Sequence, residues 1–112
     1  MSTMITDRTY RIARENTQAM IIDVQERLTP HIYDHENIVK KTVTLIKGLQ
    51  ALDIPIMLNE QYKKGIGETI PSLNELVKEY PHFEKTTFSC YKNEETIEAI
   101  NATDKKVVIV AG

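Results

Sequence analysis

The chain has 112 residues, of which 41% are hydrophobic and 27% charged, proportions that are typical of a single globular domain. Its net charge of −2 gives no electrostatic reason to expect nucleic acid or an anionic membrane as a partner, and no apolar run approaches the ~18 residues of a membrane-spanning helix. Cys90 is the single cysteine, which excludes an internal disulfide and the zinc sites built from paired cysteines. Because the N-terminus also lacks the apolar core of a signal peptide, we expect a cytoplasmic protein.

The beginning of the chain is polar, and we predict that residues 1–17 form an N-terminal arm ahead of one domain over 18–112. Arg8, Arg11 and Arg14 recur at three-residue spacing, which places them on one side of any helical turn. An anion site is one interpretation of this spacing, and a solvated arm is the interpretation that we favour.

Short apolar runs alternate with amphipathic stretches through the rest of the chain. Runs this short and this continuously apolar suit strands that are covered on both faces, as in a parallel sheet. The predicted strands cover residues 18–23, 54–60 and 105–112. The predicted helices cover residues 37–52, 72–80 and a short stretch after Asn93, with a short extended piece before the last of them. This order predicts an α/β fold with a mainly parallel sheet.

Local signals indicate where two of the helices begin and end. Ser72 and Glu75 have the spacing of a capping box, and Pro81 should end the helix that they begin at or near Tyr80. Asn93 is expected to cap the last helix.

Ligands of parallel sheets bind beyond the carboxyl ends of the strands, and this rule singles out Asp23 at the end of the first predicted strand. Asp23 could act as a general base, or it could simply cap the next turn. Lys85 could position a substrate or stabilise negative charge if the neighbouring Phe83 and Phe88 bury it. The alternative is a surface lysine that pairs with Glu84.

Other polar residues are weaker candidates. Gln25 is a neutral donor and acceptor that follows the first strand. A nucleophilic Cys90 would need a base and an electropositive setting, so we expect a small, partly buried side chain instead. His31 and His35 have a spacing that suits a metal on a helix, but their surroundings indicate a loop, and we expect no metal.

Four segments resemble, in the same order, those of the isochorismatase-like cysteine hydrolases. Residues 16–28 resemble that family's opening strand, and residues 59–67 resemble its loop after the second strand. Residues 84–89 resemble its lysine segment, and residues 105–112 resemble the strand before its nucleophile. Lys63 stands where many members have proline. The likeness runs in register from about Tyr10 to Gly112, and it is greater to members of unassigned substrate than to true isochorismatases or nicotinamidases.

The resemblance implies a three-layer α/β/α sandwich with a mostly parallel, Rossmann-like sheet, which would be incomplete in this chain. It implies an Asp-Lys-Cys triad in which Asp23 takes the thiol proton and Lys85 holds the thiolate and orients the substrate. The thiolate would attack a small amide, ester or related substrate without a cofactor. Because the family is often multimeric, a homo-oligomer is expected. Gln25 is a lesser candidate, for substrate binding.

The family's cysteine lies a few residues beyond the strand that ends at Gly112, and Cys90 does not occupy its position. We therefore expect only Asp23 and Lys85 of the triad here, and no activity from the 112-residue chain alone. The family's strand order would place residues 107–111 beside the first strand as an exposed apolar edge. The alternative to a hydrolase is therefore a non-catalytic α/β interaction module, or an inactive fragment, that associates through this edge.

Overall fold

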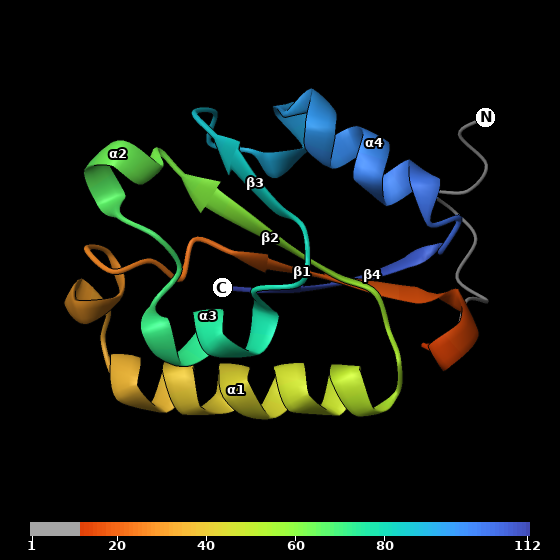
Figure 1. Ribbon diagram of the computed structural model, residues 1–112, viewed down its shortest axis with the longest axis horizontal. Helices are drawn as coiled ribbons and strands as arrows, with labels where there is room; N and C mark the ends of the chain where they lie inside the picture. Colours follow the sequence, from red (N-terminus) through yellow and green to blue (C-terminus); the bar gives the residue numbers. More distant parts are fainter. Residues whose placement is uncertain (1–11) are drawn as a thin grey trace.

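The computed structural model describes residues 12–112, and Figure 1 shows that they form one sheet with helices on both of its faces. Among these residues four strands run parallel in the order β3-β2-β1-β4. The strands are β1 (Thr17–Ile22), β2 (Ile56–Gln61), β3 (His82–Lys85) and β4 (Val107–Ala111). The expected α/β fold with a parallel sheet is confirmed, and β4 lies beside β1 as the resemblance implied.

The helices of the described residues are α1 (His35–Ala51), α2 (Lys63–Ile66), α3 (Pro71–Val77) and α4 (Glu94–Ala102). α1 and α3 pack together on one face of the sheet and α4 covers the other face, so residues 12–112 form three layers (Figure 1). Short 3-10 helices cover Arg14–Asn16, Thr29–His31 and Cys90–Lys92. Arg8 and Arg11 of the predicted arm lie outside the described residues. None of the helices in residues 12–112 is both long and apolar enough to cross a membrane.

The helix ends agree only in part with the sequence signals. Asn93 caps α4 as predicted, because its Oδ1 accepts a backbone N–H from the first turn of the helix at 3.1 Å. The capping box predicted at Ser72 is wrong. α3 begins one residue earlier, at Pro71, whose fixed φ suits the first helical position and whose missing N–H costs nothing there. It ends at Val77, where a turn closed by the Tyr80 amide and the Val77 carbonyl replaces the last predicted turn.

The strands present different side chains to the two helical layers, because successive residues of a strand point to opposite faces. The face toward α1 and α3 is an apolar core that includes Ala19, Ile21, Ile46, Leu49, Ile56, Leu58, Leu73 and Val77. Burial of a large aliphatic side chain in such a core contributes roughly 1.5–3 kcal/mol. Toward α4 the contacts are partly polar: Gln18 Nε2 donates to the Ile100 carbonyl at 3.1 Å, and Thr96 Oγ1 donates to Asn59 Oδ1 at 2.9 Å.

β4 leads the chain to the carboxyl end of β1. Gly112, directly after β4, has a φ of +139°, and a Cβ at this position would overlap the carbonyl oxygen of Ile22. Only glycine permits so close an approach of two backbones. β4 is also an outer strand of the sheet that residues 12–112 form, and Val110 on it is 61% exposed.

Candidate functional site

Asp23 directly follows β1 and adopts a φ of 58°, in the left-handed region that aspartate enters more readily than most residues. Its backbone N–H donates to the Asn59 carbonyl at 3.0 Å, which fixes this turn against β2. The Asp23 side chain is 27% exposed, and its Oδ2 lies 3.3 Å from Nζ of Lys85. Because β3 lies on the far side of β2 from β1, the structure brings these two residues together across β2 at the carboxyl edge of the sheet.

Lys85 is the last residue of β3 and is only 2% exposed. Its Nζ donates to Gln61 Oε1 at 2.6 Å and to the Thr87 and Phe88 carbonyls at 3.3 Å each, in addition to Asp23. Four oxygen atoms therefore surround an amine that has three protons to donate when charged. Such a set of acceptors is what allows a lysine to be buried, since an unpaired ammonium group would be costly in this position.

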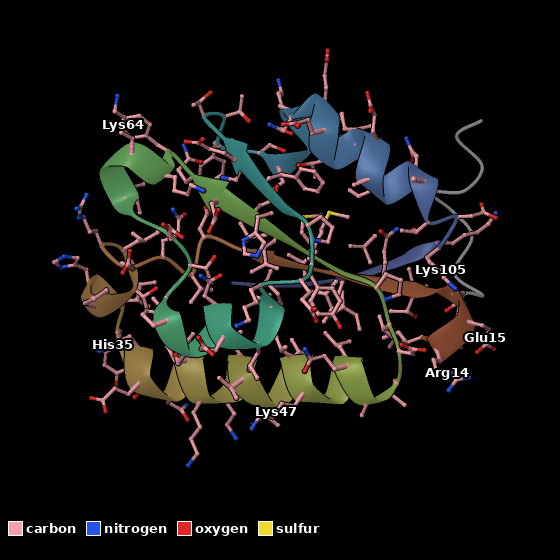
Figure 2. The ribbon with its side chains drawn as sticks, viewed as in Figure 1. Arg14, Glu15, His35, Lys47, Lys64 and Lys105 are labelled. Carbon is pink, nitrogen blue, oxygen red and sulfur yellow. The ribbon has the colours of Figure 1, made fainter. Side chains whose placement is uncertain are left out.

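The surface alternative for Lys85 is wrong. Glu84 does not pair with it, and its Oε2 accepts a hydrogen bond from the Lys63 amide at 2.9 Å instead. The expected aromatic cover is wrong for Phe88, whose side chain is fully exposed, because loop carbonyls enclose the amine instead. Lys64 and Lys47 show the ordinary alternative, since both project from the surface of the molecule in Figure 2.

Gln61 is part of this cluster, although the sequence analysis did not single it out. It ends β2 and lies opposite Lys85 in the strand register, so its side chain reaches the amine directly. The strand-end rule that identified Asp23 would have identified Gln61 if the end of β2 had been placed one residue later.

Gln25 is completely buried and holds the backbone of Gln61 rather than facing a cavity. Its Nε2 donates to the Gln61 carbonyl at 2.9 Å and to the Gly67 carbonyl at 2.6 Å. Its Oε1 accepts the Gln61 N–H at 2.7 Å. The structure therefore places Gln25 one step behind the cluster, where it fixes the end of β2 and the loop that follows.

Cys90 lies beside the cluster, partly buried, in the first position of a 3-10 helix. Burial raises the pKa of its thiol, Asp23 adds to the rise, and the charge of Lys85 offsets only part of it. A raised pKa keeps the sulfur protonated and therefore a poor nucleophile at neutral pH. His31 and His35 do not join a metal cluster, and residues 12–112 hold no group of three or more potential His, Cys, Asp or Glu ligands.

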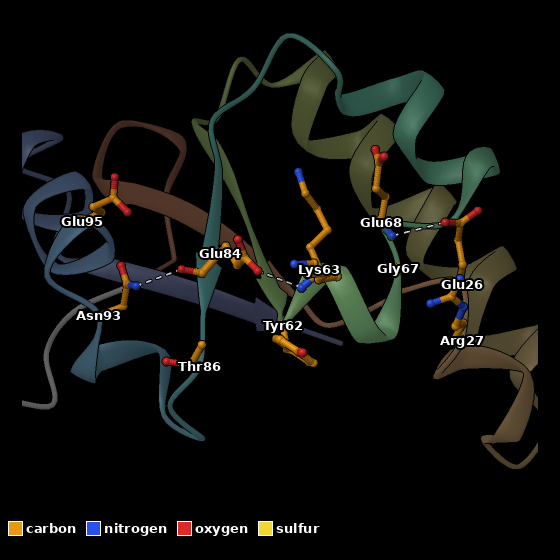
Figure 3. A pocket seen from close by; sticks show the side chains of 11 residues that line it. Glu26, Arg27, Tyr62, Lys63, Gly67, Glu68, Glu84, Thr86, Asn93 and Glu95 are labelled. Atoms are coloured by element: carbon orange, nitrogen blue, oxygen red, sulfur yellow. Dashed lines mark hydrogen bonds between the residues drawn. The ribbon is translucent and has the colours of Figure 1, made fainter.

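Two of the larger hollows among the described residues lie near the carboxyl edge of the sheet. The larger one, an open groove of about 810 Å³, is drawn in Figure 3, and its lining includes neither Asp23 nor Lys85. Its charged lining residues are Glu26, Arg27, Lys63, Lys64, Glu68, Glu84 and Glu95. The smaller one, of about 460 Å³, is mainly apolar and is lined by Asp23 together with Cys90. The smaller hollow is therefore the one through which a small neutral molecule could reach Asp23.

The profile of a known protein family covers most of the chain. The profile of the isochorismatase domain family matches residues 17–112. Isochorismatase domain-containing protein 2 of Danio rerio is 33% identical over 103 residues, which cover 91% of this chain and 51% of that protein. The chain spans about half the length of the curated relatives that it matches.

Solved structures share the arrangement of strands and helices. The MAR1 ribonuclease from Caenorhabditis elegans has a TM-score of 0.79 and 33% identity, over 90% of this chain and 52% of that one. The YcaC gene product of Escherichia coli, described as an octameric hydrolase of unknown specificity, has a TM-score of 0.83 and 23% identity, over 95% of this chain and 54% of that one. At 23% identity the second likeness bears on the fold alone.

Proposed function

Since this chain belongs to the isochorismatase domain family, we propose that Asp23 and Lys85 are two residues of a hydrolase site for a small amide, ester or related substrate. The observation that carries the proposal is the buried Lys85 amine 3.3 Å from the Asp23 carboxylate, at the edge where α/β sheets bind ligands. Taking such a pair out of water is costly, so its position beside a cavity favours a functional role. The proposed enzyme is cytoplasmic and needs no cofactor.

In the proposed reaction Asp23 accepts the proton of a nucleophilic thiol, and the Lys85 ammonium stabilises the resulting thiolate. The thiolate attacks the carbonyl carbon of the substrate, the C–N or C–O bond breaks, and Asp23 gives the proton to the leaving group. Water then releases the acid from the acyl-enzyme. Gln61 positions the Lys85 amine, and Gln25 positions Gln61 rather than contacting the substrate.

We propose that the nucleophile belongs to the segment that follows β4 in the whole protein, where the resemblance places a cysteine. The path of β4 supports this, because Gly112 packs against Ile22 and lines a small cavity together with Asp23. Cys90 is the weaker candidate because burial and Asp23 both raise its pKa. The 112-residue chain alone should therefore show no turnover, whereas turnover that Cys90→Ser abolishes would make Cys90 the nucleophile.

Variants of the whole protein test the catalytic assignment by hydrolysis of a panel of small amides and esters. Asp23→Asn removes the base while keeping its shape, and Lys85→Met removes the charge while filling the buried space. Each should lower kcat/KM by about 100-fold or more. Lys47→Met, on the exposed face of α1, is the matched control and should retain activity. An unchanged kcat/KM in a folded Asp23→Asn or Lys85→Met variant contradicts the proposal.

The small-molecule substrate is favoured over RNA, although one similar solved structure is described as a ribonuclease. Phosphate backbones are bound mainly by clustered Lys and Arg, and this chain has 14 basic against 16 acidic residues. Lys85 is also absent from the lining of the open groove of about 810 Å³, so its charge is not presented there to a phosphate backbone.

A second candidate function is a non-catalytic interaction module that associates through β4. The observation in its favour is the position of β4 at the edge of the sheet formed by residues 12–112, with Val110 exposed. We also propose a homo-oligomer, as the resemblance to an often multimeric family implies. Sedimentation of the 112-residue chain and of Val110→Lys tests the edge, because a charge there should suppress association only if β4 forms the contact.

A further inference from the structure

A small cavity of about 60 Å³ lies between the carboxyl end of β1 and the beginning of α1. Asp23 and Thr29 contribute its polar lining, together with His35 at the start of the helix. Val24, Ile32 and Ile38 make up its apolar lining, and Gly112, directly after β4, completes it. The cavity thus adjoins the carboxylate that also meets the Lys85 amine, but Lys85 does not line it.

Two of the residues that line the cavity each carry a buried side-chain oxygen without a hydrogen-bond partner among the described residues. One is Oγ1 of Thr29, a residue that is only 3% exposed. The other is Oδ1 of Asp23, the carboxylate oxygen that does not bind Lys85. Buried oxygens are almost always hydrogen-bonded, so two unpartnered ones on residues that line the same cavity point to a bound molecule.

The size and chemistry of the cavity decide what that molecule is. Pockets for drug-sized ligands occupy roughly 300–1,000 Å³, whereas a water needs only about 10–15 Å³ of accessible space and occupies about 30 Å³ in the liquid. An ionised Asp23 can only accept hydrogen bonds, while the Thr29 hydroxyl can donate or accept one. Water can donate to the first and accept from the second. A calcium or magnesium ion would require about six oxygen ligands, more than this partly apolar lining offers.

We propose that one water molecule binds in this cavity and bridges the Thr29 hydroxyl to Oδ1 of Asp23. Lys85 holds Oδ2 and the water holds Oδ1, so both carboxylate oxygens are fixed and the orientation of the base is set. Thr29 is in this way a positioning residue for Asp23. That role rests on the proposed function, whereas the water site is independent of it.

The experiment combines crystallography with thermal unfolding of the whole protein, as the wild type and as variants at Thr29, Thr42 and Asp23. Thr29→Val removes the hydroxyl with little change of shape, and Thr29→Ser keeps the hydroxyl. Thr42→Val is the matched control, because Thr42 is also buried but donates to the Ile38 carbonyl of its own helix at 2.8 Å. We expect density for one water within hydrogen-bond distance of both oxygens in the wild type and in Thr29→Ser, and none in Thr29→Val.

Thermal unfolding gives a second readout whose sign differs between the two possibilities. If the bridging water is present, Thr29→Val leaves Asp23 Oδ1 unpartnered and should lower the midpoint of thermal unfolding by about 4–8 °C. The same substitution should cause a smaller shift in the Asp23→Asn background. Without the water, the valine replaces an unpartnered hydroxyl and should raise the midpoint. A wild-type cavity without density, or a higher midpoint in Thr29→Val, overturns the proposal. Neither readout depends on turnover, so a failure of the water site can be told apart from a failure of the catalytic assignment.

Discussion

Replacement of Lys85 by methionine should destabilise the fold itself, in addition to any effect on activity. Methionine matches the length of the lysine stem but has no amine, so it fills the buried space and removes four hydrogen bonds. Gln61 Oε1 and the carbonyls of Thr87 and Phe88 lose their donor, and Asp23 loses its cation. The variant therefore isolates what the amine contributes to stability.

The magnitude follows from the burial of the two partners. Removing one partner of a fully buried ion pair costs about 3–5 kcal/mol. Lys85 is 99% buried by side chain, but the Asp23 side chain is 27% exposed, so water can screen part of the charge that remains. We therefore expect a loss of about 2–4 kcal/mol in the free energy of unfolding, a large share of the ~5–15 kcal/mol of an ordinary domain.

Urea unfolding measures this loss, and hydrogen exchange locates it. The amides of Lys92 and Asn93, which donate to the Ser89 and Cys90 carbonyls, should lose protection first, because Lys85 ties the loop before them to the sheet. Lys47→Met on the exposed face of α1 is the control and should change stability by no more than about 0.5 kcal/mol. A Lys85→Met variant as stable as the wild type would refute the account of the buried amine.

Two other predictions concern the loops around the cluster. Burial alone would raise the pKa of Glu60. Hydrogen bonds from the Thr69 N–H and hydroxyl, at 2.9 and 2.8 Å, together with the charges of His82 and Lys63, outweigh burial and lower the pKa from its ordinary 4.5. The contribution of the ionised Glu60 to stability is complete above pH 4.5 and is lost as the pH falls through the lower pKa of the folded state. On acidification, the urea midpoint of Glu60→Gln should therefore fall less than that of the wild type. Gly67 has a φ of +92° and a ψ of −178°, and a Cβ at this position would lie 3.1 Å from Glu26. Gly67→Ala should therefore lower the free energy of unfolding by about 1–3 kcal/mol, measured by calorimetry. An unchanged melting temperature would contradict the described conformation of this loop.

The fold and the position of Asp23 could be predicted from the sequence because they depend on local patterns. A short apolar run that ends on a carboxylate places Asp23 at a strand end, and the alternation of strands with helices requires a parallel sheet. Asn93 as a helix cap is equally local, since its partner lies within the first turn of α4. Such features need no knowledge of distant residues.

The burial of Lys85 could not be predicted in the same way, because its acceptors depend on the three-dimensional arrangement. Gln61 reaches the amine only through the register of β2 with β3, and two further acceptors are the backbone carbonyls of Thr87 and Phe88, which carry no sequence signal. Gln25 is a similar case, because the hydrogen-bond partners of its side chain lie 36 to 42 residues away and its burial follows from them. Aromatic neighbours were a reasonable but wrong guide, since Phe88 faces solvent.

The left-handed backbone at Asp23 changes how substitutions there should be interpreted. Only glycine, asparagine and aspartate enter this conformation at little cost, so alanine, glutamate or valine would alter the turn as well as the carboxylate. A saturation library at this codon would thus mix conformational damage with lost proton transfer in nearly every member. Asparagine separates the two effects, because it keeps the left-handed backbone and removes only the negative charge. An Asp23→Asn variant that is inactive but correctly folded would therefore report on the loss of proton transfer.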